Sequence, residues 1–260
     1  MVALIERDVE YRLGDTGMRG LLIAPDGAIE RPAVLLIHDA FGLGDDMIAI
    51  GHRLAECGYA VFGADVWGDR TTPEKQPEIG PLIGSMVGNR SEWIARVAEA
   101  HRTAVAQPEV DEDNVVLLGY CFGGSSALEF ARTGGSAKGV IAIHPGLDII
   151  EFDWAAANAD VQALVSLGAV DPMATAEQRA ELERALNGAG IDWELHLYSH
   201  TAHAFTSLKA QDSPRPEVFA YHPRNAERAW DATTRFLREL FPDISGAQPD
   251  RTRETEDVNA

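Results

Sequence analysis

The chain has 260 residues, of which 45% are hydrophobic and 24% charged, a composition that fits one globular domain with a large core. Its formal net charge of −19 argues against nucleic acid or an anionic membrane as a partner, because both attract clustered lysine and arginine. The N-terminal residues show no signal-peptide pattern, and no stretch approaches the roughly 18 apolar residues of a membrane-spanning helix. We expect Cys57 to be a buried thiol and the protein to be cytoplasmic.

Strands and helices alternate in the first part of the chain. Residues 2–13 and 18–24 flank a Gly-Asp-Thr-Gly turn and predict an antiparallel hairpin at one edge of a sheet. Two apolar strands are expected at residues 32–37 and 59–64, and a helix that begins with two aspartates over residues 45–58.

The segment over residues 65–88 breaks this pattern. It contains three prolines and four glycines and has no clear period, so we expect a long loop or a small cap over the sheet. A helix follows over residues 89–107 and ends before Pro108.

The second part returns to the alternation and completes one doubly wound α/β domain over residues 1–242. The remaining residues, 243–260, hold little apolar material and are expected to be a disordered tail. The strands expected here are 115–118, 139–143, 161–167 and 192–198, and the helices are 125–132, 176–188 with a capping box of Thr175 and Gln178, and 223–240.

The turn after the strand at 115–118 reads Gly-Tyr-Cys-Phe-Gly, with Cys121 at its centre. A strand, this turn and a helix form the context of a nucleophile elbow, in which cysteine here replaces the commoner serine. Gly119 and Gly123 leave room for a nucleophile in a strained backbone conformation. The start of a helix also favours a thiolate over a thiol.

Three residues suited to acyl transfer follow three separate predicted strands. They are Cys121, Asp171 and a histidine after residue 198, either His200 or His203. Because the carboxyl ends of parallel strands meet at one edge of a sheet, we expect these side chains to converge. The order nucleophile, acid, base along the chain is that of the α/β-hydrolases, which predicts that fold.

Each of these assignments has an alternative. The turn alone also fits a buried, inert cysteine. His200 competes with His203 as the base, and Asp148 competes with Asp171 as the acid. A helix cap is the other role open to Asp171.

Four stretches together resemble the dienelactone hydrolase family, over roughly residues 18 to 241. The resemblance implies a nucleophilic Cys121, with Asp171 orienting the base His203. The family also places an acidic residue, usually glutamate, before the oxyanion turn to pair with the resting thiol, and Asp39 stands there in this chain. The stretches are Leu-Leu-Ile-His-Asp-Ala-Phe-Gly-Leu at 35–43, Gly-Tyr-Cys-Phe-Gly-Gly at 119–124, Gly-Ala-Val-Asp-Pro at 168–172 and His-Ala-Phe-Thr at 203–206.

One departure from the family concerns the substrate. The family's founding enzyme holds a substrate carboxylate with arginines, one of them shortly after the catalytic histidine, and residues 204–207 contain none. Arg70 and Arg90 are the remaining candidates for binding an anion, whereas Trp67 and Phe205 are candidates for an apolar pocket. Since the site is set in a strongly negative protein, we expect neutral esters or lactones to be preferred.

The expected reaction is attack of Cys121 on an ester or lactone carbonyl, with the oxyanion held by the backbone N–H groups of Phe122 and Ala40. His38 is expected to hold the oxyanion loop. No metal or other cofactor is expected, and the protein is expected to be a monomer or a homodimer. A non-catalytic binding module of the same fold is the rival interpretation, and a redox thiol is a weaker one because no C-x-x-C pair is present.

Overall fold

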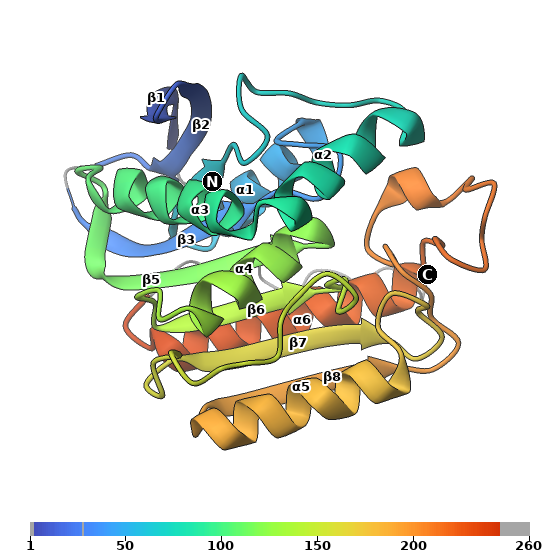
Figure 1. Ribbon diagram of the computed structural model, residues 1–260. Helices are drawn as coiled ribbons and strands as arrows, with labels where there is room; N and C mark the ends of the chain where they lie inside the picture. The colour runs from blue at the N-terminus through green and yellow to red at the C-terminus, as the bar shows by residue number, and fades with distance from the viewer. Residues whose placement is uncertain (1–2, 28, 245–260) are drawn as a thin grey trace, which may run out of the picture.

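The computed structural model describes residues 3–27 and 29–244. Eight strands form one sheet in the order β1-β2-β4-β3-β5-β6-β7-β8 (Figure 1). The hairpin of β1 (Leu4–Leu13) and β2 (Thr16–Pro25) is antiparallel, and β2 also pairs antiparallel with β4 (Ala60–Ala64). The other strands pair in parallel: β3 (Arg31–Ile37), β5 (Val110–Tyr120), β6 (Gly139–Ile143), β7 (Gln162–Gly168) and β8 (Asp192–Tyr198).

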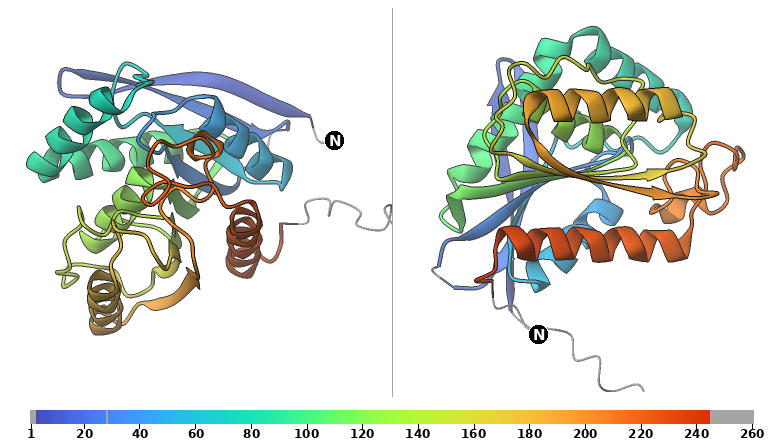
Figure 2. Two further views of the ribbon diagram at one scale, coloured as in Figure 1. Left: turned by 90° about the vertical axis from the view of Figure 1, so that its right-hand side faces the viewer. Right: turned by 90° about the horizontal axis from the view of Figure 1, so that it is seen from below.

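Helices cover both faces of this sheet (Figure 2). On one face lie α1 (Asp45–Glu56) and α6 (Pro223–Leu240). On the other lie α3 (Arg90–Val105), α4 (Phe122–Arg132) and α5 (Ala176–Ala189). The prediction of a mostly parallel, doubly wound sheet with an N-terminal antiparallel hairpin is therefore confirmed.

The central strands explain why both faces are covered. In β5, Val116 and Leu118 pack towards α1 and α6, whereas Val115 and Leu117 pack towards α3 and α4. Successive side chains of a strand point to opposite faces, so an uninterrupted apolar run can be buried only when each face carries helices.

Over residues 65–88, where a long loop or a small cap was expected, the second half of the segment is a helix. There α2 (Gln76–Gly88) forms, with Pro77 in its first turn, where a missing N–H costs nothing, and Pro81 in its interior. Burial of Ile79 and Met86 offsets the lost hydrogen bond and the poor helix propensity of the glycines. Tertiary packing overrides local preference in this segment.

Several helix boundaries also differ from the prediction, among them the ends of α1 at Glu56 and of α3 at Val105. The helix after Cys121 begins at Phe122 instead of residue 125. The predicted capping box of Thr175 and Gln178 is present at the start of α5. This helix runs to Ala189, one residue beyond the predicted end at 188, and Gly190 follows it in the left-handed conformation.

Two further expectations from the sequence concern membrane-spanning helices and the C-terminal tail. No helix within residues 3–27 and 29–244 is long and apolar enough to cross a membrane. Apart from Asp243 and Ile244, the segment expected to be a disordered tail lies outside the described residues.

Candidate active site

The turn between β5 and α4 holds Cys121 in a strained conformation. Its φ of 53° and ψ of −117° are rarely adopted by any residue with a side chain. A Cβ atom on Gly119 would lie 2.0 Å from the carbonyl oxygen of Gly123, and one on Gly123 would lie 2.1 Å from that of Ile37. The two flanking glycines are therefore required for the backbone to bend this sharply, and the bend presents the sulfur at the carboxyl edge of the sheet.

Three side chains from separate loops meet at this point. His203 Nε2 lies 3.1 Å from Cys121 Sγ, and His203 Nδ1 lies 2.7 Å from Asp171 Oδ2. The other carboxylate oxygen of Asp171 accepts a hydrogen bond from the backbone N–H of Met173 at 2.8 Å. Because Asp171 can only accept, Nδ1 carries a proton and Nε2 faces the sulfur. The arrangement is that of a nucleophile, a base and an orienting acid.

The geometry also bears on the competing residues. His200 is exposed and does not contact the thiol, and Asp148 is exposed and does not contact the base. The helix cap that was the other role open to Asp171 is supplied by Thr175. Thus the structure brings together Cys121, His203 and Asp171, and neither His200 nor Asp148 takes part in this chain of contacts.

Electrostatics favour the protonated form of His203. Burial acts to lower the pKa of His203, but the negative charge of Cys121 and the hydrogen bonds from His203 to Asp171 and Cys121 outweigh burial and raise the pKa to about 10. At neutral pH, the protonated form of His203 is therefore stabilised between the sulfur and the carboxylate.

The loop after β3 is braced beside the elbow. His38 Nδ1 donates to the carbonyl of Asp39 at 2.7 Å, and its Nε2 accepts the N–H of Val66 at 3.1 Å, so the ring is neutral with both nitrogens bonded. Trp67 Nε1 donates to the carbonyl of Ala40 at 3.3 Å. The loop that carries Ala40 is thereby held beside α4, since the His38 ring lies 6.4 Å from that of Phe122. Helix geometry leaves the N–H of Phe122, in the first turn of α4, without an intrahelical acceptor.

Asp39 lies in this loop but does not bond to the thiol. Its Oδ1 accepts the backbone N–H of Phe41 at 2.8 Å, while Cys121 Sγ is bonded to His203. Burial raises the pKa of Asp39 to about 6, with the N–H of Phe41 opposing the shift. The aspartate is thus poised to change its charge close to neutral pH, within the field of His203.

His144 is a residue that the sequence analysis missed. It follows β6 directly, is buried in a backbone conformation with φ of 39°, and has its Nε2 2.8 Å from Thr206 Oγ1. Its ring centroid lies 5.2 Å from that of His203. The available signal was its position, because it stands immediately after a strand end, as do the residues that were selected.

The aromatic residues proposed for a substrate pocket have other surroundings. Phe205 is fully buried between Tyr198 and His144 and belongs to the core. Trp67 is buried and its ring stacks on Phe122 at 4.3 Å. Neither residue offers an open surface, because each ring is enclosed by neighbouring side chains.

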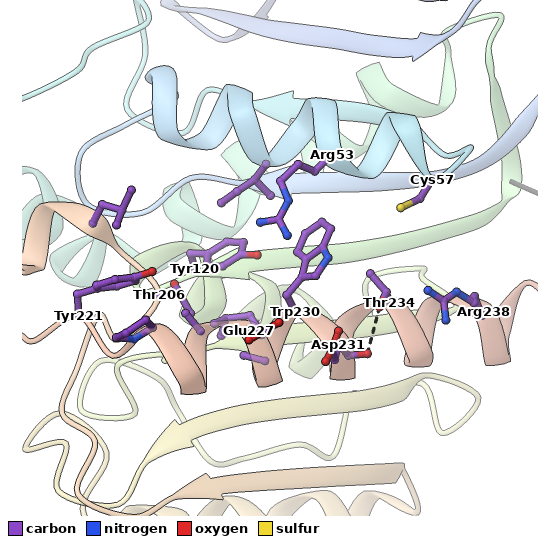
Figure 3. Close-up of a pocket in the computed structure, with 16 residues that line it drawn as sticks. Arg53, Cys57, Tyr120, Thr206, Tyr221, Glu227, Trp230, Asp231, Thr234 and Arg238 are labelled. Atoms are coloured by element: carbon purple, nitrogen blue, oxygen red, sulfur yellow. Dashed lines mark hydrogen bonds between the residues drawn. The ribbon is translucent and has the colours of Figure 1, made fainter. Parts of the chain in front are cut away.

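Open space lies instead between α1 and α6. A groove of about 660 Å³ runs along these helices, and Figure 3 shows Arg53 of α1 facing Trp230 of α6, with Tyr120 of β5 beside them. A smaller cavity of about 190 Å³ adjoins it and is lined by Asp39 and His144. The open space between α1 and α6 is thus continued by a cavity that reaches Asp39 and His144, close to His203.

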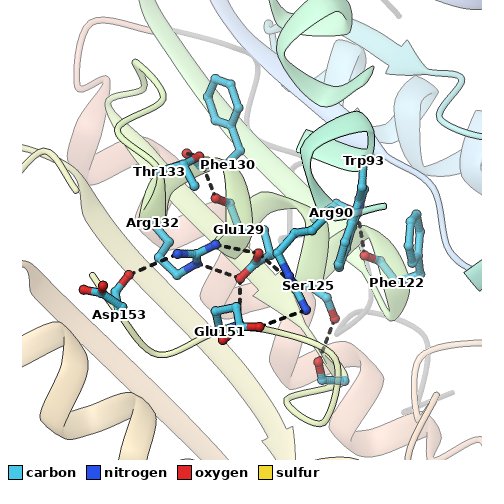
Figure 4. Close-up of polar contacts among 12 residues, drawn as sticks. Arg90, Trp93, Phe122, Ser125, Glu129, Phe130, Arg132, Thr133, Glu151 and Asp153 are labelled. Atoms are coloured by element: carbon cyan, nitrogen blue, oxygen red, sulfur yellow. Dashed lines mark hydrogen bonds and ion pairs between the residues drawn. The ribbon is translucent and has the colours of Figure 1, made fainter. Parts of the chain in front are cut away.

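The two arginines proposed for anion binding are engaged elsewhere. Arg70 pairs with Asp8 at 3.2 Å and donates to the carbonyl of Arg19 at 2.9 Å, which ties it to the hairpin. Arg90 pairs with the buried Glu129 at 2.7 Å, in the network drawn in Figure 4. Their charges are already neutralised by carboxylates, so neither presents a free cation to the thiol.

Metal binding is not indicated at this edge of the sheet. Within the described ranges, no three histidine, cysteine, aspartate or glutamate side chains are grouped so as to hold an ion. Both cysteines, Cys57 and Cys121, are free thiols.

The sheet order and the site at the end of β5 define an α/β-hydrolase. Residues 18–241 match the dienelactone hydrolase family, and the chain belongs to that family. The predicted membership is confirmed, and with it the prediction of an enzyme that hydrolyses esters or lactones.

Similar proteins extend over nearly the whole chain. The solved structure m3DLH is 32% identical, with a TM-score of 0.85, and the match covers 92% of this chain and 99% of that one. A dienelactone hydrolase-like promiscuous phosphotriesterase from metagenomic libraries is 30% identical, with a TM-score of 0.84 and the same coverage. A protein of Aquifex aeolicus (strain VF5) named "Putative carboxymethylenebutenolidase" is 24% identical, over 88% of this chain and 96% of its own length.

Proposed function

We propose that this enzyme hydrolyses a small ester or lactone through a cysteine nucleophile and a thioester intermediate. The observation that carries the proposal is the contact chain Cys121–His203–Asp171, with separations of 3.1 Å and 2.7 Å, at a turn whose backbone is strained. Strain of this kind persists where the surrounding structure enforces it, which is common at catalytic groups.

In the first half of the reaction, Cys121 Sγ forms a bond to the carbonyl carbon and the carbonyl oxygen becomes an oxyanion. The backbone N–H groups of Phe122 and Ala40 stabilise that charge. When the tetrahedral intermediate collapses, the C–O bond to the leaving group breaks, and His203 gives its proton to the departing oxygen.

In the second half, water replaces the leaving group. His203 takes a proton from the water, whose oxygen bonds to the thioester carbon. Collapse breaks the C–S bond, releases the acid, and returns the proton to the pair formed by the sulfur and His203. Asp171 holds the imidazole in the required tautomer throughout.

The substrate class follows from the sulfur. A thiolate is a good leaving group as well as a good nucleophile, so the tetrahedral intermediate expels a poor leaving group such as an amine less readily than it expels the thiolate. Esters and lactones whose leaving group is a stabilised alkoxide or enolate are therefore favoured over amides. The thiol must also stay reduced, and we place the enzyme in the cytoplasm for that reason.

Trapping the intermediate tests this proposal. Wild-type protein quenched in acid during turnover of para-nitrophenyl acetate should gain one acetyl group on Cys121, detected by mass spectrometry. Cys121→Ala should gain none and should lose at least about 10³-fold in kcat, since removal of a catalytic nucleophile typically costs that much or more. Turnover by folded Cys121→Ala, or an acetyl group only on another residue, would contradict the proposal. Absence of turnover would favour a binding module.

A further inference from the structure

We propose that the groove between α1 and α6 holds an aryl-bearing arm of the substrate; this inference rests on the proposed ester or lactone hydrolysis. The groove is the space of about 660 Å³ between those two helices, and it lies within the roughly 300–1,000 Å³ that small-molecule pockets occupy.

The opposite flank of the elbow is occupied by aromatic side chains. There Phe122, the residue after Cys121, stacks between Trp67 and Trp93, with ring centroids 4.3 Å and 5.1 Å away. Trp93 is fully buried and donates its Nε1 hydrogen to Ser126 at 2.9 Å, and His38 closes the stack 5.3 Å from Trp67. The aromatic stack fills the α3 side of the nucleophile with side chains whose polar atoms are bonded.

The groove, in contrast, starts next to the site. Tyr120 and Ile143, which line it, are the residues immediately before Cys121 and His144. The groove and the smaller cavity beside Asp39 and His144 have walls in common, so the two spaces adjoin. The shared wall residues are Ile50, Arg53, Tyr120, Thr206 and Leu208.

The walls suit a flat ring. Trp230 rises from α6 towards Arg53 of α1, whose guanidinium carbon lies 3.7 Å from the centre of the indole ring (Figure 3). Tyr120 and Tyr221 add two further rings at the end nearest the site. Aromatic rings prefer stacked or edge-to-face contact with other rings, and an arginine plane stacks on an aromatic face.

The charges in the groove favour a neutral arm. Two arginines, Arg53 and Arg238, and two acids, Glu227 and Asp231, lie along it, so neither sign dominates. A carboxylate would meet α6 acids as well as the arginines, whereas a neutral ring would bury apolar surface against Trp230 without desolvating a charge.

The test compares a short and a long substrate in each variant. Para-nitrophenyl acetate and para-nitrophenyl phenylbutanoate place the aryl arm on the acyl side; phenyl acetate and biphenylyl acetate place it on the alcohol side. In one of these pairs, wild type should prefer the long substrate by kcat/KM, and Trp230→Ala should reduce that preference at least about tenfold, a range typical of hydrophobic pocket contacts. Turnover of the short esters should fall much less than turnover of the long ones.

Two further variants distinguish a specific effect on the groove from a general loss of structure. Ala226→Phe, on the groove face of α6, should fill the space and reduce the same preference without removing a tryptophan. Trp193→Ala removes a partly buried tryptophan that packs on the other face of the sheet and should leave the preference unchanged. The inference is overturned if Trp230→Ala lowers short and long substrates equally, or if Ala226→Phe leaves the long substrate unaffected.

A binding measurement keeps the inference separate from the proposed reaction. Cys121→Ala should bind at least one of the two long esters, para-nitrophenyl phenylbutanoate and biphenylyl acetate, with saturation in isothermal titration calorimetry. The added Trp230→Ala change should weaken that binding at least about tenfold. If wild type hydrolyses none of these esters while the binding difference persists, the proposed reaction is wrong but the assignment of the groove as a binding site is upheld. If the binding of neither long ester responds to Trp230→Ala, the groove assignment is wrong whatever the activity.

Discussion

The imidazole of His144 lies at 66° to that of His203, with the ring centroids 5.2 Å apart. Burial first, and the positive charge of His203 second, hold the pKa of His144 well below its ordinary value. A neutral ring is therefore packed against the base, where a second cation would repel the imidazolium. Through its hydrogen bond to Thr206, His144 also holds the loop that carries His203.

Removing that hydrogen bond should slow the chemistry more than it weakens substrate binding. Thr206→Val deletes the hydroxyl while keeping the side-chain shape. We expect kcat for a short ester to fall about 5–10-fold with KM nearly unchanged, because a factor of this size corresponds to the free energy of one buried hydrogen bond. Thr206→Ser keeps the hydroxyl and should retain most of the activity. A rise in KM alone, or an equal loss in both variants, would contradict a positioning role for the pair.

The base itself can be identified by comparing two histidines of the same loop. His203→Ala should lose nearly as much activity as Cys121→Ala, whereas His200→Ala, which removes an exposed ring, should remain close to wild type. Asp171→Asn should keep the geometry but allow the wrong tautomer, with a loss of up to about 10⁴-fold in kcat by analogy with serine enzymes. A crippled His200→Ala with an active His203→Ala would reverse the assignment.

The sequence predicts the fold because its signals are strong and local. Uninterrupted apolar runs such as residues 32–37 specify strands covered on both faces, and the glycines around Cys121 specify the sharp turn. Since each strand end carries one reactive residue, the convergence of Cys121, Asp171 and His203 follows from topology alone.

What could not be predicted depends on contacts between distant residues. The α2 helix forms despite its prolines because Ile79 and Met86 are buried by the rest of the domain. The pairing of Arg90 with Glu129 joins two helices, and nothing in either local sequence indicates the partner. The groove at Trp230 exists only because α1 and α6 pack on the same face of the sheet.

Asp39 should make stability depend on pH. Burial raises its pKa to about 6 from an ordinary 3.8, so the folded state binds the proton more tightly than the unfolded state. Its contribution is fully present below about pH 4 and is lost as pH rises through about 6, with a total of about 3 kcal/mol at most. Asp39→Asn stays neutral, so its free energy of unfolding should increase relative to wild type between pH 4 and pH 7, measured by urea titration.

The comparison needs an aspartate on the surface as a reference. Asp212→Asn alters an exposed side chain, and its difference from wild type should be small at both pH values. If Asp39→Asn gains no stability relative to wild type as the pH rises, Asp39 does not titrate in this window.

The network around Glu129 should contribute to stability instead of substrate binding. Its carboxylate is 1% exposed and pairs with Arg90 at 2.7 Å and Arg132 at 2.8 Å. Glu129→Gln removes the buried carboxylate that Arg90 and Arg132 share and leaves Arg90 with the exposed Glu151 at 3.4 Å, and we expect a loss of about 3 kcal/mol in the free energy of unfolding. Glu181→Gln, on the exposed face of α5, should change it by less than about 0.5 kcal/mol. Equal losses of stability in the two variants would show that the ion pairs of Glu129 do not stabilise the fold.

The preference for neutral substrates can be tested through charge and salt together. We expect the segments over residues 65–88 and 204–222, which follow strand ends, to line the mouth of the site. Three of their four lysine and arginine side chains are already paired: Arg70 with Asp8, Lys209 with Asp46 and Arg215 with Glu217. An anionic ester therefore approaches a protein of net charge −19 in which these three cations are already neutralised, and repulsion slows its association. We expect kcat/KM to favour a neutral ester over a carboxylated ester with the same leaving group, and the gap to narrow when salt is raised from about 10 mM to about 500 mM. Arg90→Ala should leave the ratio unchanged. A preference for the anion that disappears in Arg53→Gln would instead assign the groove arginine to a substrate carboxylate.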